Sequence, residues 1–402
     1  MVYLACVNIM HPKVIIIGIG FTSRLGMIRA VAETGAEITV IVLCHERFKP
    51  VDCYSKYIHR CFYVKGNNEN RILQILTKYY IDPSRKGILI PINDFAAMVI
   101  DQNVNFLKEY FFFPHIKMHQ GAVSEWMNKE KQKAVASRIG LNIAESVNIE
   151  LIQGSYQLPD GIKYPCFTKT RTYIGGYKHT LHRCDDEISL RNVLDFLATK
   201  HRDITIMVEE YKEISTEYAV VGFSDGKQVV IPGIIEILVM AKGNDRGVAC
   251  QGKIMPIIGF EDLVEKFKKL ILEIGFVGLF DIDFYLSRGK YYFGEINLRI
   301  GGSATAVLKM GVNLPGMFVR SLLGEPFVDM KMEVDSTAIF VNERICSDNW
   351  YQGFLSKSEL DELLSSSDIS FVKDDVDVKP EQRFVWELRL LGLKRMLRRC
   401  IK

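Results

Sequence analysis

Residues 280–303 read FDIDFYLSRGKYYFGEINLRIGGS, the pattern of two β-strands joined by a tight turn at Arg288-Gly289. Side chains alternate between the two faces of a strand. In the first strand one face carries Asp281, Asp283 and Tyr285, and the other carries Phe280, Ile282, Phe284 and Leu286. In the second strand we expect one face to carry Tyr291, Phe293, Glu295 and Asn297. The hairpin therefore places carboxylates among aromatic side chains.

The length of the turn decides whether two of these acids meet. A three-residue loop with glycine at positive φ places Asp283 directly opposite Glu295, whereas a two-residue loop places them on opposite faces. Opposed carboxylates repel one another, and this is costly on a buried face unless a cation lies between them. Mg²⁺ prefers oxygen ligands of the kind that Asp283, Glu295 and Asn297 offer, and Arg299 follows where it can reach an anion. The alternative is an edge hairpin with a solvated acidic face.

Upstream of the hairpin, strands alternate with helices. Residues 13–18 (KVIIIG), 38–43 (ITVIVL) and 87–92 (GILIPI) are short apolar runs typical of buried parallel strands. Helical spacing lies between them at about 24–34 and 70–80. This alternation predicts an α/β fold with a doubly wound parallel sheet up to about residue 115.

The pattern changes after this sheet. We expect a polar, Lys-rich helix over 121–140, mainly short strands over 143–235 and a helix over 262–274 before the hairpin. Another helix is expected to begin near Thr305. Residues 326–402 are polar and predicted to be irregular until a last basic helix from Glu387 to Lys402. That helix could rest on an anionic membrane surface, on a partner protein, or on its own domain.

A glycine-rich turn offers a different function. Gly18-Ile19-Gly20 lies between a predicted strand and a predicted helix, as in a dinucleotide-binding turn, and Glu46 lies where a ribose-binding acid could sit. The third glycine of that pattern would fall on Ser23. An NAD-dependent oxidoreductase is the alternative that this turn leaves open, although it does not explain the acidic hairpin.

Composition narrows the class of protein. The 402 residues have a net charge of +3, which gives no reason to expect nucleic acid as a partner. Nine cysteines without a CxxC pair favour free thiols in a reducing compartment, and the first ten residues lack the features of a secretory signal, so we expect a cytoplasmic protein. Two Cys/His sets lack standard zinc spacing and are attributed to packing. They are Cys53, His59 and Cys61, and His179, His182 and Cys184.

The hairpin resembles the metal motif of the ATP-grasp superfamily, because Asp283 is followed by Glu295, Asn297 and Arg299 in that family's order. The resemblance extends over residues 13–325. It implies a Rossmann-like pre-ATP-grasp domain at 1–118, followed by a two-lobed α+β ATP-grasp domain. The lobes are expected at 119–205 and 206–325, with a C-terminal extension at 326–402.

The resemblance also implies a nucleotide site. Lys129 and Lys169 are similar to the two lysines that reach the nucleotide phosphates, and Gly175-Gly176 to the flexible loop over them. The segment with Glu209, Glu210, Tyr211 and Lys212 resembles the hinge that holds adenine, and Glu217 the acid that binds the ribose. Arg246 lies where a basic residue would face the transferred phosphoryl group, and Lys242 or Lys253 could take that role instead.

What the resemblance implies chemically is a carboxylate–amine ligase that uses ATP and one or two Mg²⁺ ions, for which Mn²⁺ can substitute. A carboxylate is phosphorylated by ATP, and an amine then displaces phosphate to form an amide; Arg299 and Arg246 would stabilise the charges that develop. EINLRIGGS resembles D-aspartate ligase-like members most. A homodimer and a non-catalytic nucleotide-binding regulator are further readings that the family leaves open.

The substrates are expected at the carboxyl ends of the parallel strands, where open α/β sheets bind ligands. Asp94 and the loop from Gly20 to Arg24 lie at such ends, and Ser303 beside Gly301-Gly302 could help to hold a substrate carboxylate. The carboxylate and the amine are small molecules whose identity the sequence leaves open.

Overall fold

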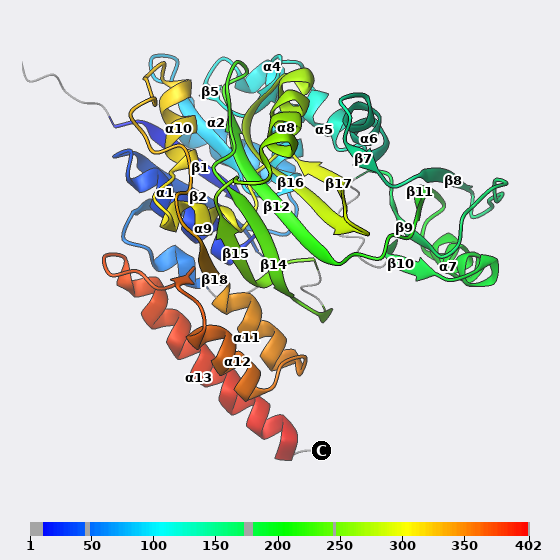
Figure 1. Ribbon diagram of the computed structural model, residues 1–402. Helices are drawn as coiled ribbons and strands as arrows, with labels where there is room; N and C mark the ends of the chain where they lie inside the picture. The colour runs from blue at the N-terminus through cyan, green and yellow to red at the C-terminus, as the bar shows by residue number, and fades with distance from the viewer. Residues whose placement is uncertain (1–10, 45–48, 173–179, 244–246, 401–402) are drawn as a thin grey trace, which may run out of the picture.

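A five-stranded parallel sheet forms the first part of the chain, in a computed structural model that describes residues 11–44, 49–172, 180–243 and 247–400 (Figure 1). Its strands, in spatial order, are β3 (Ile58–Lys65), β2 (Glu37–Cys44), β1 (Lys13–Gly18), β4 (Gly87–Pro91) and β5 (Phe111–Phe112). The connecting segments contain α1 (Phe21–Ala32), the 3₁₀ turn η1 (Val51–Tyr54), α2 (Glu69–Tyr80), α3 (Asp94–Gln102) and α4 (Val104–Leu107). The expected doubly wound sheet is confirmed.

Both faces of this sheet are buried at its centre, because β1, β2 and β4 are apolar at nearly every position. Val14 and Ile16 pack toward α1, in a core that also includes Phe318, whereas Ile15 and Ile17 pack toward α2 and α3. Continuous apolar runs of this kind are what a parallel sheet covered by helices on both sides requires.

A second lobe is built on a four-stranded antiparallel sheet, at the right of Figure 1. Its order is β10 (His182–Cys184), β9 (Cys166–Thr170), β11 (Asp203–Glu210) and β8 (Ser146–Ile152). The expectation of mainly short strands missed α7 (Glu187–Lys200), which covers one face of this sheet. Asp186 and Ser189 form a capping box at its start, and Leu190, Leu194 and Leu197 are buried at helical spacing, so the signal was present in the sequence.

The third sheet has ten strands and carries the hairpin. Its main path is β19 (Ile369–Ser370), β18 (Ala338–Val341), β15 (Ala249–Met255), β14 (Ile234–Met240), β12 (Thr216–Ser224), β16 (Phe276–Ser287), β17 (Lys290–Asn297) and β7 (Asn142–Ile143). β13 (Val229–Val230) pairs with β12, and β6 (His115–Ile116) pairs with β16.

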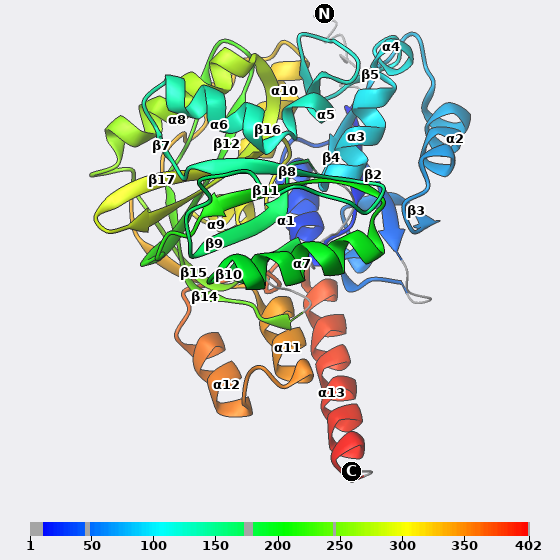
Figure 2. The same ribbon diagram turned by 90° about the vertical axis from the view of Figure 1, so that its right-hand side faces the viewer.

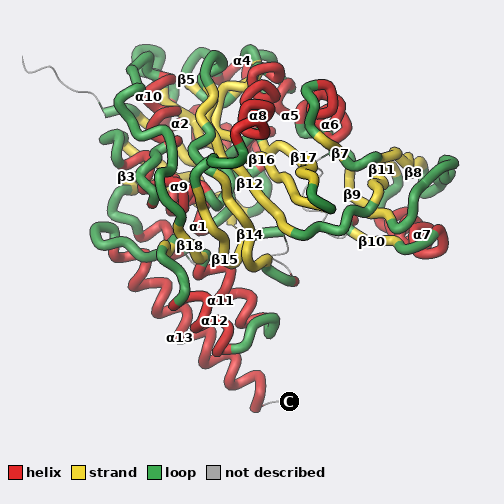
Figure 3. Tube along the Cα trace, viewed as in Figure 1, coloured by secondary structure: helices red, strands yellow, loops and turns green. Residues whose placement is uncertain are grey.

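Helices close both faces of the ten-stranded sheet, as the red and yellow segments of Figure 3 show. α8 (Glu261–Ile274) ends at Gly275, which has a left-handed conformation, and packs on one face with α5 (Ala122–Trp126) and α6 (Lys129–Arg138). α9 (Ala304–Lys309) and α10 (Leu314–Leu322) lie between the other face and α1. One apolar core therefore joins the parallel sheet to the sheet that carries the hairpin.

The expectation that residues 326–386 are irregular is wrong. β18 extends the large sheet beside β15, and α11 (Glu343–Gln352) and α12 (Lys357–Ser365) follow it. The last helix, α13 (Val378–Cys400), begins nine residues earlier than Glu387 because Pro380 is tolerated in a first helical turn. Short elements with few apolar positions give weak hydrophobic periodicity, so the local sequence did not reveal β18, α11 and α12. The hydrogen-bonded pairing with β15 holds β18 in the sheet. The domain limits at residues 118, 205 and 325 stay a prediction.

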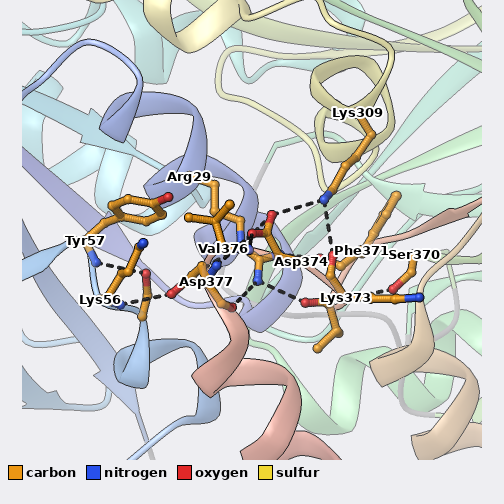
Figure 4. Close-up of polar contacts among 12 residues, drawn as sticks. Arg29, Lys56, Tyr57, Lys309, Ser370, Phe371, Lys373, Asp374, Val376 and Asp377 are labelled. Carbon is orange, nitrogen blue, oxygen red and sulfur yellow. Dashed lines mark hydrogen bonds and ion pairs between the residues drawn. The ribbon is translucent and has the colours of Figure 1, made fainter.

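A buried ionic cluster fastens the C-terminal segment to the parallel-sheet domain (Figure 4). Arg29 of α1 donates to Asp377 Oδ2 at 3.3 Å and to the carbonyl oxygens of Phe371 and Val372 at 3.1 and 3.0 Å. Lys309 of α9 lies 3.2 Å from Asp374. From this anchor α13 runs away from the body of the molecule in both ribbon views (Figures 1 and 2). Among the helices of the described ranges, none combines the length and the apolar character that crossing a membrane requires.

Candidate active site

The hairpin brings the two predicted acids together by a different route from the one expected. Its loop has two residues, Arg288 at φ 47° and Gly289 at φ 73°, and Ser287 pairs with Lys290. That loop alone would pair Asp283 with Gly294. A β-bulge between Asp283 and Phe284 shifts the register by one residue, so that Asp283 pairs with Glu295.

Gly294 is required at this bulge. A Cβ atom there would lie 2.8 Å from the carbonyl oxygen of Asp283. The prediction that Tyr291, Phe293, Glu295 and Asn297 share one face of the second strand is wrong, because the bulge shifts the pairing between Phe293 and Glu295. Tyr291 and Phe293 point into the apolar core under α8, whereas Glu295 and Asn297 line the cavity on the other face. The faces predicted for the first strand are confirmed.

Asp281, Asp283 and Glu295 occupy neighbouring positions on the face of the hairpin that lines the cavity, where their negative charges repel one another. Burial first, and the negative charge of Asp283 second, raise the pKa of Asp281 well above its ordinary value. The pKa of Asp283 is also raised, because the walls of the cleft reduce its solvation although its side chain opens onto the cavity. Asn297 Nδ2 donates to Asp283 Oδ2 at 3.3 Å. The oxygen atoms of Asp283, Glu295 and Asn297 carry more negative charge than the surrounding groups neutralise, and a bound cation would compensate it.

Lys129, at the start of α6, forms an ion pair with Glu295. The two residues are 166 positions apart in the sequence. Burial, followed by the neighbouring charge of Lys169, lowers the pKa of Lys129 to about 8. Lys129, which is predicted to reach the nucleotide phosphates, is therefore paired in this structure with Glu295, a predicted metal ligand.

Lys169, on β9, faces the same cleft from the four-stranded sheet. Its Nζ lies 2.8 Å from Glu209, and Lys133 Nζ lies 2.5 Å from the other oxygen of that carboxylate. Burial alone would raise the pKa of Glu209, but the charges of Lys169 and Lys133 lower it. Glu209 therefore positions two lysines and does not act only as part of a hinge.

Arg299 lies at the boundary between the hairpin and the parallel sheet. Its Nε donates to Asp94 Oδ1 at 3.0 Å, and its Nη2 donates to Asn297 Oδ1 at 3.3 Å. Burial alone would lower its pKa, but Asp94 and Asp281 raise it, so the guanidinium stays charged. Asp94, which the sequence placed at a strand end, thus orients the predicted catalytic arginine.

A cavity of about 550 Å³ is lined by Lys169, Asp283, Glu295, Asn297 and Arg299. It runs from Lys169 and Glu217 at one end, past the metal-ligand set, to the loop after β1 at the other. Burial, followed by the charge of Asp283, raises the pKa of Glu217. The predicted substrate residues Ser23 and Ser303 line the far end.

The hinge residues line a second cavity, of about 620 Å³. Glu210, Tyr211 and Lys212 lie in its wall together with Tyr292 of the hairpin. The backbone N–H of Tyr211 donates to Pro165 O at 3.0 Å, and Lys212 Nζ lies 2.8 Å from Glu210. The hinge is thus held against both the four-stranded sheet and the hairpin.

Three predicted residues, Gly175, Gly176 and Arg246, lie outside the described residues. Of the two alternatives to Arg246, Lys253 lies 2.5 Å from Glu236, and neither it nor Lys242 lines the cavity.

The glycine turn after β1 serves the fold. Arg24 is buried and donates to Gly18 O at 3.0 Å and to Asp52 Oδ1 at 3.0 Å, so its side chain points away from the cavity. Thr22 and Ser23 of the same loop do line it. This arrangement gives the oxidoreductase alternative no support.

Two contributors were not predicted as site residues. Asp281 lies two residues before Asp283 on the same strand and also lines the cavity; strand alternation had placed both acids on one face without assigning Asp281 to the site. Lys133 follows Lys129 by four residues on α6, the spacing that puts two side chains on one helical face.

The residues fit Mg²⁺ bound together with a nucleotide. Among the described residues, no group of three or more His, Cys, Asp and Glu side chains converges as a metal site by itself. Asp283, Glu295 and Asn297 offer two carboxylates and one amide, and Mg²⁺ characteristically completes such a set with phosphate and water oxygens. The pairing of Asp283 with Glu295 across the ladder, which opposes two carboxylates, is the structural observation that favours a cation there.

No family model matches the chain. The carbamoyl phosphate synthase large chain of Gemmatimonas aurantiaca is 24% identical over 238 residues, which are 58% of this chain and 22% of that protein. The corresponding protein of Clostridium beijerinckii is 24% identical over 277 residues, 68% of this chain and 25% of that protein. The chain thus spans about a quarter of the length of these relatives.

Solved structures show the fold across most of the chain. N5-carboxyaminoimidazole synthetase of Staphylococcus aureus with ADP aligns with a TM-score of 0.60 at 16% identity, over 82% of this chain and 81% of that one. The L-amino acid ligase of Bacillus licheniformis gives 0.60 at 16% identity, over 82% and 79%. Biotin carboxylase of Campylobacter jejuni gives 0.61 at 16% identity, over 82% and 75%. This shared architecture shows that the chain has the fold of these three enzymes.

Proposed function

We propose that this protein is an ATP- and Mg²⁺-dependent ligase that joins a carboxylate to an amine through an acyl phosphate. The observation that carries the proposal is the bulged pairing of Asp283 with Glu295 in the wall of a cavity that Lys169 also lines, with Lys129 paired to Glu295. Paired carboxylates opposite lysines are suited to phosphoryl transfer, which needs positioning and charge neutralisation more than covalent help.

In this proposal Asp283, Glu295 and Asn297 would hold Mg²⁺, or Mn²⁺ in its place, which would supply positive charge for the phosphates of ATP. Lys129 and Lys169 exchange their carboxylate partners for phosphate oxygens when the nucleotide binds. The hinge from Glu209 to Lys212 receives the adenine, and Glu217 the ribose. Gly175, Gly176 and Arg246 are retained as proposed contacts of the phosphates.

The chemistry has two steps. A carboxylate oxygen of the first substrate attacks the γ phosphorus, and the bond to the β–γ bridging oxygen breaks to release ADP. The amine nitrogen then attacks the acyl carbon, a C–N bond forms, and the C–O bond to phosphate breaks. Arg299, held by Asp94, lies where it can stabilise the negative charge of both steps.

The named relatives support this class of reaction. Carbamoyl phosphate synthase resembles this chain in part of its sequence, and N5-carboxyaminoimidazole synthetase and L-amino acid ligase share its fold. An amide or peptide bond to an amino acid, as in D-aspartate ligase-like enzymes, is the finer form of the proposal. The catalytic machinery described above gives no reason to favour the non-catalytic regulator.

The test is turnover with defined substrate pools. The protein is incubated with ATP, Mg²⁺ and pools of amino acids and small carboxylates, and ADP, phosphate and new masses are measured. We expect amine-dependent phosphate release and an amide product in the wild type and neither in Asp283→Asn. Wild-type turnover in Asp283→Asn would contradict the proposal, as would hydride transfer with NAD.

Two proposals concern partners. A homodimer is proposed by analogy with the biotin carboxylase domain solved as a dimer; sedimentation of the full chain tests it, and a monomer at all concentrations contradicts it. For α13, we propose a peripheral contact with an anionic membrane or a protein. Truncation after residue 386 should then abolish co-sedimentation with anionic vesicles or the partner, whereas an unchanged bound fraction decides against it.

A further inference from the structure

Asp281 is an acid in the cleft that the proposed ATP chemistry does not use. It is 9% exposed, it lines the cavity, and its Oδ1 atom is buried without a hydrogen-bond partner. The other acids around it have partners: Asp283 has Asn297, Glu295 has Lys129, and Asp94 has Arg299. A buried carboxyl oxygen without a donor is unfavourable, so a ligand that brings a donor would satisfy it.

Two glycines, Gly301 and Gly302, form the backbone beside Asp281, and Gly301 packs so closely against the acid that no side chain fits there. A Cβ atom on Gly301 would lie 1.7 Å from Asp281 Oδ2, and one on Gly302 would lie 3.2 Å from Ser23 Oγ. The glycine pair therefore bridges the unsatisfied acid and the hydroxyl at the start of α1 without a side chain between them.

The opposite end of this space suits an anion. α1 is a 12-residue helix whose N-cap, Gly20, provides no side-chain cap. The first N–H groups of a helix lack intrahelical partners, and its N-terminus favours negative charge. The hydroxyl-bearing residues Thr22 and Ser23, in that first turn, line the same cavity as Asp281.

Part of the remaining wall is apolar, although Asn93 and Asn342 also line the cavity. Ile237, Met240, Val248 and Ala249 line it from β14, β15 and the segment between them. Of the described residues that line the cavity, the cations are Lys169 and Arg299, and both belong to the phosphoryl-transfer end. The far end therefore suits one carboxylate with a side chain of modest polarity better than a phosphorylated substrate.

We propose that the amine substrate is an α-amino acid whose amino group is held by Asp281 and whose carboxylate lies at the N-terminus of α1. The proposal rests on the ligase function above. Asp281 lies beside Asp283 and near Arg299, so the nitrogen is placed at the reacting acyl phosphate. It attacks the acyl carbon, the C–O bond to phosphate breaks, and the surplus proton leaves with the departing phosphate. Asp281 is thus a substrate-positioning residue.

The test measures binding to the full chain saturated with Mg²⁺ and the non-hydrolysable analogue AMP-PNP. Calorimetric titrations use the common amino acids in both enantiomeric forms, their 2-hydroxy acid analogues, and amines without a carboxylate. We expect at least one amino acid to bind more than about tenfold more tightly than both of its analogues. Equal affinity for the hydroxy acid, or the absence of binding by every amino acid, overturns the proposal.

Two variants assign the binding groups. Asp281→Asn should weaken the amino acid by more than about tenfold and leave Mg²⁺–AMP-PNP affinity within about twofold, and Ser23→Ala should weaken the amino acid and its hydroxy analogue alike. Asp160→Asn, an exposed acid on a surface turn, is the matched control and should change neither affinity. Loss of nucleotide binding in Asp281→Asn, or unchanged amino acid binding, contradicts the assignment.

Failure of the inference is distinguishable from failure of the ligase function. Wild-type protein that binds no Mg²⁺–nucleotide contradicts the ligase itself. Amine-dependent ADP formation with an amine that has no carboxylate leaves the ligase intact and removes only the α-amino acid.

Discussion

Lys129 and Lys169 each have a carboxylate partner in this structure, Glu295 and Glu209 respectively. The lysine charges thus neutralise acids that would otherwise repel one another. In the proposed function, nucleotide binding replaces these contacts by phosphates and Mg²⁺. Breaking these ion pairs lowers the affinity for the nucleotide, and the freed lysine charges then stabilise the negative charge that develops during phosphoryl transfer.

Lys169→Met tests this at the level of one side chain. Glu209 keeps Lys133 as a partner at 2.5 Å, so the fold should persist, while the rate of ADP formation should fall by about 10²- to 10³-fold. Lys266→Met, which removes an ion pair with Asp262 on the surface of α8, is the control and should keep the wild-type rate. A rate in Lys169→Met close to that of the control would exclude Lys169 from the site.

At the scale of elements, the β-bulge in the hairpin brings the two proposed metal ligands, Asp283 and Glu295, opposite one another. Gly294→Ala introduces a Cβ atom 2.8 Å from the carbonyl oxygen of Asp283, so the bulge must shift and Asp283 and Glu295 lose their pairing. We expect Mg²⁺–nucleotide affinity to fall by about tenfold or more in calorimetry. Gly392→Ala, where the added Cβ meets Trp350 at an ordinary 3.7 Å, should bind as the wild type does.

The anchor before α13 gives a pH-dependent prediction. Burial alone would raise the pKa of Asp374, but the N–H groups of Asp377 and Val376, with Arg29 and Lys309, lower it from 3.8 to about 2. A depressed folded-state pKa stabilises the fold above pH 3.8, and this contribution is lost as the pH falls toward 2.

The measurement is urea unfolding of the wild type and Asp374→Asn at several pH values. The wild type should be the more stable protein at pH 6, and the difference should shrink as the pH falls from about 4 toward 2. A difference that is independent of pH would show that Asp374 does not stabilise the folded state through its charge.

At the scale of the whole molecule, the proposed nucleotide site joins two sheets. Lys169 comes from the four-stranded sheet, and Asp283 from the ten-stranded sheet. A nucleotide that contacts both should stabilise the fold by mass action, by about 2.7 kcal/mol when its concentration is about 100 times the dissociation constant. The thermal midpoint should therefore rise with Mg²⁺–AMP-PNP.

EDTA should remove most of that stabilisation, and Asp283→Asn should show little of it even at saturating Mg²⁺. A nucleotide effect of equal size with and without the metal would place the nucleotide elsewhere.

The local pattern of the sequence determined much of this protein. Apolar runs predicted the parallel strands, helical spacing predicted α2 and α8 nearly to their ends, and alternation put Asp281 and Asp283 on one face. These features repeat within a few residues, so neighbouring side chains reveal them. The family order of motifs added the fold of the second and third sheets.

Only the tertiary structure decided which distant groups meet. The bulge that pairs Asp283 with Glu295, the contact of Lys129 with Glu295 and the addition of β18 to the edge of β15 each depend on partners far away in the chain. Such contacts form because packing brings the surfaces together and excludes water, which no local periodicity records. The sequence therefore predicted which acids lie on one face of the hairpin, and the assembled sheets gave Asp283 and Glu295 their partners and left Asp281 Oδ1 without one.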